Sequence, residues 1–115
     1  MKRGEVWWAV LGKAQGNESG FRRPVLIVQD DLLTESRLST VMIVPLTSNQ
    51  RRAAAIGNVV LEARDTGLPR AAVALVCQVM IIDKTWLLDR AGMLPKRATR
   101  KVDAGLELAL GLSAG

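Results

Sequence analysis

Histidine and tyrosine are absent from this 115-residue chain, and cysteine and phenylalanine occur once each. Without histidine the chain lacks the commonest metal ligand and the usual general base near neutral pH, so any catalysis must proceed without both. Cys77 cannot form a disulfide within the chain, which agrees with a reducing compartment. No apolar run approaches the ~20 residues of a membrane span. The first residues form no signal-like apolar region, so we expect a cytoplasmic protein.

Positive charge is in excess, with 16 Lys and Arg against 11 Asp and Glu and a net charge of +5. This balance favours anionic partners, namely nucleic acid or an acidic peptide. Hydrophobic residues make up 49% of the chain, and a chain of this length buries roughly two-thirds of its unfolded surface. We therefore expect one globular domain over residues 1–115.

Short apolar or alternating runs separated by turns dominate the pattern, and a single helical repeat closes the chain. Asp30 or Asp31 can cap a short helical turn over residues 32–37. Pro45 cannot donate to a ladder, so its strand must end, bulge or lie at an edge there. The pattern predicts a mainly β fold with helices, of the α+β class: a small, strongly bent barrel or sheet with a terminal helix. The expected strands are residues 5–11, 23–28, 40–46, 58–62 and 87–93, with an apolar run at 71–82 and turns at 65–69 and 83–86.

The closing helix is expected to start at Pro95. Gly105 inside it should cost about 1 kcal/mol relative to alanine. One apolar face is predicted from Val102, Leu106, Ala109 and Leu110. Four cations crowd the first turns, where the helix dipole disfavours them: Lys96, Arg97, Arg100 and Lys101. Either solvent screens this cost, or a bound anion or an acidic partner compensates it.

Several residues carry simple structural expectations. Trp7 and Trp8 are consecutive on a strand and so point to opposite faces, one into the core and the other onto a surface. Met42 and Met80 lie in apolar runs and are expected in the core, and Cys77 is expected as a small buried hydrophobe.

A glycine-flanked loop followed by a buried strand stands out at residues 16–28. The loop contains Glu18, then Arg22 and Arg23, and Pro24 closes it before the run Val25–Val28. A guanidinium at the start of a rigid strand would be held still in front of a ligand. The alternative is a basic loop that only keeps the protein soluble.

Five motifs in order link this stretch to the rest of the chain. They are Arg3-Gly4-Glu5-Val6-Trp7-Trp8, then Gly16-x-Glu18 with Arg23-Pro24, then Val44-Pro45-Leu46-Thr47, then Gln78 ahead of Asp83-Lys84, and a closing Leu108-Ala109-Leu110-Gly111-Leu112. In this order and spacing the chain resembles the MazF/PemK toxins of bacterial toxin–antitoxin pairs, over nearly its whole length.

The resemblance implies an SH3-like barrel with a C-terminal helix, a homodimer, and an endoribonuclease that cuts single-stranded RNA at short sequences. It implies no metal or other cofactor, and an antitoxin whose acidic or apolar tail occupies the RNA groove. It also implies that Arg23, directly before the proline, and Thr47 are catalytic, with Glu18 as the loop carboxylate. Cleavage would use the 2′-hydroxyl as nucleophile and leave a 2′,3′-cyclic phosphate and a 5′-hydroxyl.

The chemistry of these side chains fits that reaction. Arg23 offers a charged fork that matches two phosphate oxygens, and Thr47 can add a hydroxyl donor. Glu18 can act as a base if its pKa is raised, although the family's mechanism also gives its arginine an acid–base role, so the division of labour stays open. In the structural alternative, Glu18 only pairs with Arg22 or Arg23, and Thr47 caps a turn.

Single-stranded RNA would be held by charge contacts and stacking. Phe21 either stacks on a base or fastens the loop to the barrel. Met80 and Ile81 replace an arginine and a threonine common in the family, which affects base preference more than cleavage. The candidate RNA contacts are Lys13, Gln15, Phe21, Arg22, Ser48, Asn49, Arg51, Arg52 and Gln78.

Two other functions compete with this one. Gyrase-poisoning relatives of the same fold lack the arginine–threonine pair and depend on a C-terminal Trp-Gly-Ile. This chain keeps the pair and ends Leu112-Ser113-Ala114-Gly115. The remaining alternative is a basic, non-catalytic nucleic-acid-binding module.

Overall fold

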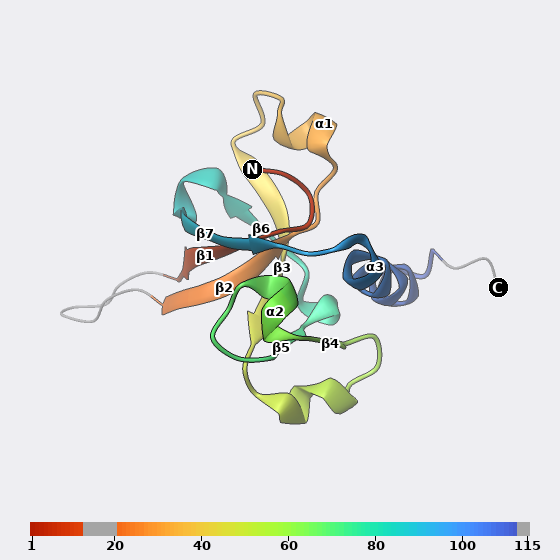
Figure 1. Cartoon of the computed structure of the whole chain (residues 1–115). Helices are drawn as coiled ribbons and strands as arrows, with labels where there is room; N and C mark the ends of the chain where they lie inside the picture. The colour runs from red at the N-terminus through yellow and green to blue at the C-terminus, as the bar shows by residue number, and fades with distance from the viewer. Residues whose placement is uncertain (13–20, 113–115) are drawn as a thin grey trace.

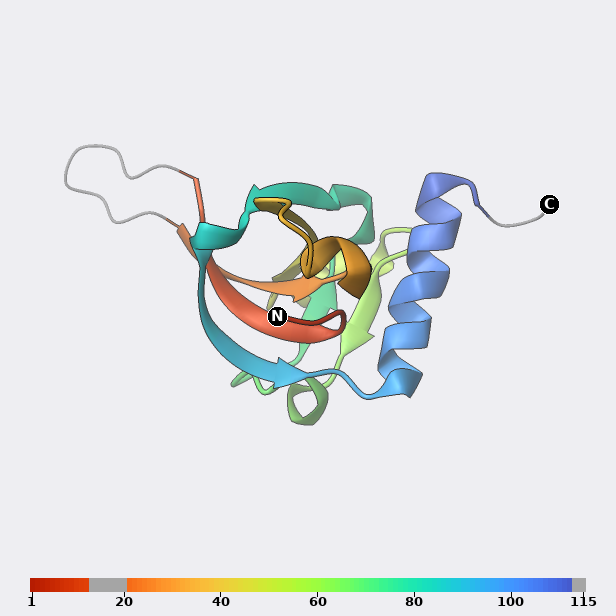
Figure 2. The same cartoon turned by 90° about the horizontal axis from the view of Figure 1, so that it is seen from above.

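A curled antiparallel sheet with a helix along one side forms the framework of the molecule (Figures 1 and 2). The structure is a computed structural model and describes residues 1–12 and 21–112. Within that part of the chain, the elements in order are β1 (Glu5–Leu11), β2 (Phe21–Ile27), α1 (Asp31–Thr34), β3 (Thr40–Thr47), the 3₁₀ turn η1 (Gln50–Ala54), β4 (Val59–Leu61), α2 (Ala63–Thr66), β5 (Ala72–Ala74), η2 (Val76–Gln78), β6 (Met80–Asp83), η3 (Lys84–Trp86), β7 (Leu87–Met93) and α3 (Lys96–Leu110).

The strands of the described residues follow the order β4-β5-β3-β2-β1-β7, and β6 pairs with β3 beside this path. Every pairing is antiparallel. Strong curvature lets β3 pair with β6 along its first half and with β5 at its end. No helix of the described residues is long and apolar enough to cross a membrane.

Two apolar clusters lie on the two faces of the β1–β2–β3 ribbon. Val6 and Leu26 belong to the larger cluster, which α3 covers with Ala98, Val102 and Leu106. Ala9, Val25 and Ile27 belong to the smaller cluster inside the curl of the sheet, with Val41, Ile43 and Ile82. Even-numbered and odd-numbered residues of β2 therefore face different cores, as the strand period requires.

Both tryptophans are half-buried, so the expectation of one core and one surface tryptophan was wrong. Trp7 packs against the smaller cluster and Trp8 against the larger one. The indole Nε1 of Trp7 donates to Glu5 Oε1 at 3.1 Å. Because the ribbon has a core on each face, both rings find apolar partners.

Several predicted strands and turns are confirmed, whereas others have different bounds or split into more than one element. The strands at 5–11 and 87–93 and the helical turn after Asp83 are present, and Asp30 caps α1 by accepting from Leu32 N at 2.9 Å. The run at 71–82 is two strands joined by η2. The expected turn at 65–69 begins as the helix α2, which ends at the left-handed Gly67. Cys77 is exposed on η2, so its predicted burial was wrong.

The apolar face of α3 differs from the prediction at its C-terminal end. Val102 and Leu106 are buried, whereas Ala109 and Leu110 are exposed. Gly105 is buried because the helix approaches another segment closely: a Cβ there would lie 2.3 Å from Gly57 O. The close approach of the two backbones explains why a poor helix former stands at this position.

One cation of the first turns of α3 is compensated within the chain. Arg97 donates to both carboxylate oxygens of Asp65, at 2.9 and 2.7 Å. The carboxylate is almost completely buried, and its hydrogen bonds to Arg97 hold the pKa of Asp65 below its ordinary value. The acidic partner that the sequence left open is thus a residue of α2.

Candidate active site at the ends of two neighbouring strands

Arg23 and Thr47 lie at the ends of two paired strands. Val25 of β2 and Pro45 of β3 are register partners. Arg23 precedes Val25 by two residues and Thr47 follows Pro45 by two, so the strand period puts both side chains on one face. Arg23 is exposed and Thr47 half-buried. Both line a cleft of about 410 Å³.

The cleft opens where β3 changes partner. Up to Ile43, β3 pairs with β6, and from Leu46 it pairs with β5. Pro45 lies between these pairings, and its carbonyl accepts from Leu75 N at 3.0 Å. In a strand the N–H and C=O of one residue point the same way, so the donor that proline lacks would face the gap between β5 and β6. The strand therefore continues to Thr47 without ending or bulging, and Pro45 fits the third of the expected alternatives, because its nitrogen lies at a local edge between the two pairings.

Three predicted RNA contacts share this cleft with Arg23 and Thr47: Asn49, Arg52 and Gln78. The Thr47 hydroxyl oxygen accepts from the backbone N–H of Asn49 at 3.2 Å. This leaves the hydroxyl hydrogen available to a ligand. The side chain of Asn49 accepts from Arg51 N at 3.1 Å and so caps η1.

Other predicted site residues lie around or outside the cleft. Ser48 lines a second hollow of about 290 Å³, which also includes Arg23 and Thr47. Arg51 is exposed on η1. Three candidate site residues lie outside the part of the chain that the structure describes: Glu18, Lys13 and Gln15. The side chain of Phe21 is not described either.

Arg22 points to the opposite face of β2 from Arg23. Its guanidinium carbon lies 5.2 Å from the ring centroid of Trp8, and its Nη2 lies 3.2 Å from Asp89 Oδ2. Of the two adjacent arginines, only Arg23 lines the cleft, whereas both border the second hollow. The sequence carries no signal for Trp8 and Asp89 at this site, because each occupies an ordinary position within a predicted strand.

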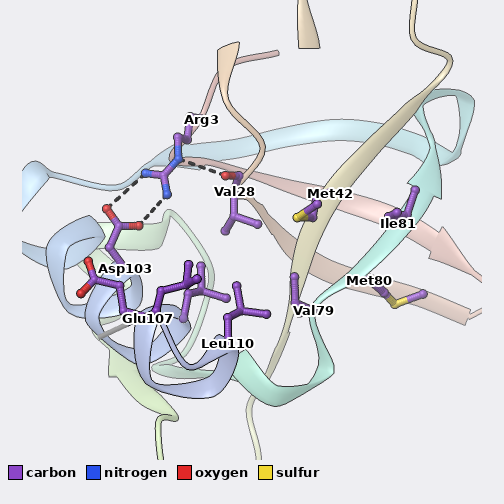
Figure 3. Close-up of a pocket in the computed structure, with 11 residues that line it drawn as sticks. Arg3, Val28, Met42, Val79, Met80, Ile81, Asp103, Glu107 and Leu110 are labelled. Atoms are coloured by element: carbon purple, nitrogen blue, oxygen red, sulfur yellow. Dashed lines mark hydrogen bonds and ion pairs between the residues drawn. The ribbon is translucent and has the colours of Figure 1, made fainter. Parts of the chain in front are cut away.

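A further hollow, of about 550 Å³, lies elsewhere, between α3 and the β3–β6 pair (Figure 3). The side chains in it are mostly apolar, and the Arg3–Asp103 ion pair, at 2.6 Å, closes one end. Met42 and Met80 are 37% and 38% exposed here, so their expected core positions were wrong. Met80 also lines the Arg23 cleft, and the two hollows are therefore neighbours.

Acidic and sulfur ligands are dispersed across the described part of the molecule. Within residues 1–12 and 21–112, no three His, Cys, Asp or Glu side chains come together in a way that could hold a metal ion. The groups that meet in the cleft are a guanidinium, a hydroxyl and amides. Such donors can bind a phosphate and stabilise added negative charge on it.

Comparison with known proteins gives a consistent result. Residues 2–110 match the sequence profile of a family described as a PemK-like, MazF-like toxin of type II toxin–antitoxin systems. Endoribonuclease MazF6 of Mycobacterium tuberculosis is 43% identical over 112 residues, which cover 97% of this chain and 98% of that protein. Endoribonuclease EndoA of Bacillus subtilis is 34% identical over 113 residues, with coverage of 97% and 96%.

Solved structures share the architecture. An endoribonuclease in complex with its cognate antitoxin, from a mycobacterial species, superimposes with a TM-score of 0.81 at 23% identity, covering 100% of this chain and 99% of that one. A MazE–MazF structure from Deinococcus radiodurans gives 0.80 at 22% identity, covering 98% and 97%. These likenesses confirm the predicted fold class, a small curled antiparallel half-barrel with a C-terminal helix.

Proposed function

Because the chain belongs to the PemK-like, MazF-like toxin family of type II toxin–antitoxin systems, we propose that it is a metal-independent endoribonuclease that cuts single-stranded RNA at a short sequence. The supporting observation is the joint placement of Arg23 and Thr47 in one cleft at neighbouring strand ends. The Arg23 guanidinium would hold two oxygens of the scissile phosphate and stabilise the phosphorane. The Thr47 hydroxyl would donate to the same phosphate.

Proton transfer in this proposal involves Glu18, the carboxylate five residues before Arg23 in the sequence. The 2′-oxygen attacks phosphorus, its proton passes to a base, and the 5′-oxygen leaves as it gains a proton. The RNA strand would run across the cleft and the adjoining basic surface. Its proposed contacts are Lys13, Gln15, Phe21, Arg22, Ser48, Asn49, Arg51, Arg52 and Gln78.

The proposal also covers the protein partner, the oligomeric state and the cellular compartment. A cognate antitoxin with an acidic or apolar tail would cover the basic cleft and block RNA, as expected for a protein of net charge +5. We also propose a single domain over residues 1–115, assembly as a homodimer and action in the cytoplasm, where single-stranded RNA is available.

A cleavage assay on defined RNAs tests the function. The purified protein is incubated with single-stranded RNAs in excess chelator, and the ends are identified by direct phosphorylation of new 5′-hydroxyls. We expect cleavage to persist and to leave 2′,3′-cyclic phosphates. Arg23→Ala and Thr47→Ala should abolish it while keeping the circular dichroism spectrum of the wild type.

Each other outcome has a distinct meaning. Failure to cut any RNA, with retained RNA binding, would favour the non-catalytic module. Normal cleavage by both variants would show that the site assignment is wrong. Inhibition of DNA gyrase without RNA cleavage would favour a toxin that acts on a protein target.

A further inference from the structure

The second hollow, beside Ser48, lies on the face of the β2–β3 strand ends opposite the cleft. Trp8 of β1 and Pro24 of β2 are register partners, so their side chains are neighbours on this face. The Arg22 guanidinium stands 5.2 Å from the Trp8 ring centroid. An indole and a guanidinium present flat surfaces of the kind on which nucleic-acid bases stack, and the proline ring adds an apolar surface beside them.

The facing wall of this hollow is the segment from Leu68 to Ala72, and it is fixed to the rest of the protein. Leu68 N donates to Thr66 Oγ1 at 3.1 Å, and Gln50 Nε2 donates to Ala71 O at 3.1 Å. Gly67 begins the segment with a φ of +78°, and a Cβ there would lie 2.2 Å from Ala91 O. These contacts tie the wall to α2, to η1 and, through the preceding Gly67, to β7, so the wall is part of the folded framework.

Charge at the rim favours an anion. Arg70 is exposed and, among the residues the structure describes, forms no ion pair. Arg22 pairs with Asp89, but both side chains are more than half exposed, and such pairs are weak. A phosphate approaching the rim would therefore meet two guanidinium groups that can turn toward it at a small cost in free energy.

We propose that this hollow is a nucleotide subsite of the RNA-cleaving site, and this inference rests on the proposed function. One nucleotide next to the scissile phosphate stacks its base on the Trp8–Pro24 side, and its own phosphate is bound by Arg70. The hollow and the cleft share Arg23 and Thr47. A strand that crosses the sheet end at Arg23 thus places successive nucleotides on opposite faces of β2, and specificity extends beyond the cleft.

The test combines a protein variant with a substrate series. Once the cut sequence is mapped, kcat/KM is measured for a minimal RNA and for RNAs lengthened by one or two nucleotides on the 5′ or the 3′ side. Arg70→Ala is the test variant because the side chain is exposed. Arg64→Ala is the control for charge, since it removes one exposed arginine, paired with the exposed Glu62, from the neighbouring α2, outside the hollow.

Lengthening on one side should raise kcat/KM of the wild type and of Arg64→Ala by about tenfold, the effect of one charge-assisted contact. Arg70→Ala should gain less than about threefold from the same lengthening, because the added phosphate has lost its partner. An equal loss on short and long RNAs would overturn the proposal, since Arg70 would then supply only general charge. If Arg70→Ala weakened antitoxin binding but gained as much kcat/KM as the wild type when the RNA was lengthened, the hollow would be assigned to a protein partner instead.

A binding measurement separates this inference from the proposed function. RNAs with hydrogen in place of the scissile 2′-hydroxyl carry the fluorescent base 2-aminopurine on either side of the scissile phosphate. Quenching at one of the two positions, weakened in Arg70→Ala, is the expected result, and because these RNAs cannot be cut it reports on the hollow separately from the chemical step. Quenching at neither position would refute the subsite.

Discussion

Replacing Arg23 by lysine should test the site more sharply than replacing it by alanine. Lysine keeps the positive charge but offers one point of contact, whereas the guanidinium offers a two-point fork. The position is exposed at a strand end and lysine keeps the charge, so the change in unfolding free energy should stay within about 1 kcal/mol. Any large loss of activity would then come from the reaction itself.

The magnitude follows from the role proposed for the fork. Removing one preorganised donor from a charge-stabilising site costs about 2.7–4 kcal/mol of transition-state stabilisation, or about 100- to 1,000-fold in kcat. Arg22→Lys is the internal comparison, because Arg22 is adjacent in sequence but points to the other face of β2. Arg22 is proposed to contact RNA away from the reacting phosphate, and lysine keeps its charge, so we expect at most about a tenfold loss, the effect of one charge-assisted contact.

A fluorogenic RNA that contains the mapped cut site gives initial rates for both variants, and urea unfolding checks their stability. We expect kcat of Arg23→Lys to fall by about 100-fold or more with little change in stability. A larger loss in Arg22→Lys than in Arg23→Lys would refute the assignment of the two faces. A fall in kcat matched by a fall in stability would show that Arg23 acts on the fold.

Two further predictions concern the framework. Gly105→Ala should lower the unfolding free energy by about 1–3 kcal/mol, because the clash with Gly57 O outweighs the gain of about 1 kcal/mol in helix propensity; a more stable variant in urea would contradict the close approach. Arg97 lowers the pKa of Asp65, so the carboxylate stabilises the fold above its ordinary pKa of 3.8, and this contribution is lost as pH falls through the lowered value. Asp65→Asn should therefore be less stable than the wild type at pH 7, and the difference should shrink below about pH 4; a difference that stays constant down to pH 2 would contradict this linkage.

Local pattern was enough to predict the strands whose apolar residues face a core and whose ends carry turn residues. The closing helix was also predictable, because Val102 and Leu106 repeat at helical spacing. Adjacent charges on a strand fall on opposite faces by period alone, which separates Arg22 from Arg23. The resemblance to a toxin family, and not the pattern, ranked Arg23 above Arg22.

The errors have physical causes that local sequence does not contain. Met42, Met80 and Leu110 are apolar but border an open groove, and composition cannot distinguish an apolar side chain in a core from one on such a surface. Elements of three or four residues, such as α2 and η2, depend on long-range contacts rather than on periodicity. The reason for Gly105 is a backbone more than forty positions away, which no local window includes.

The interruption at Pro45 has a consequence for the cleft. A gap in a sheet is ordinarily a defect, because unpaired backbone groups on its rim draw the strands together. Here the rim residue has no N–H to satisfy, and its carbonyl already accepts from Leu75. Closing the gap at Pro45 would therefore gain no hydrogen bond from either backbone group of this residue, and keeping it open leaves neither group unsatisfied.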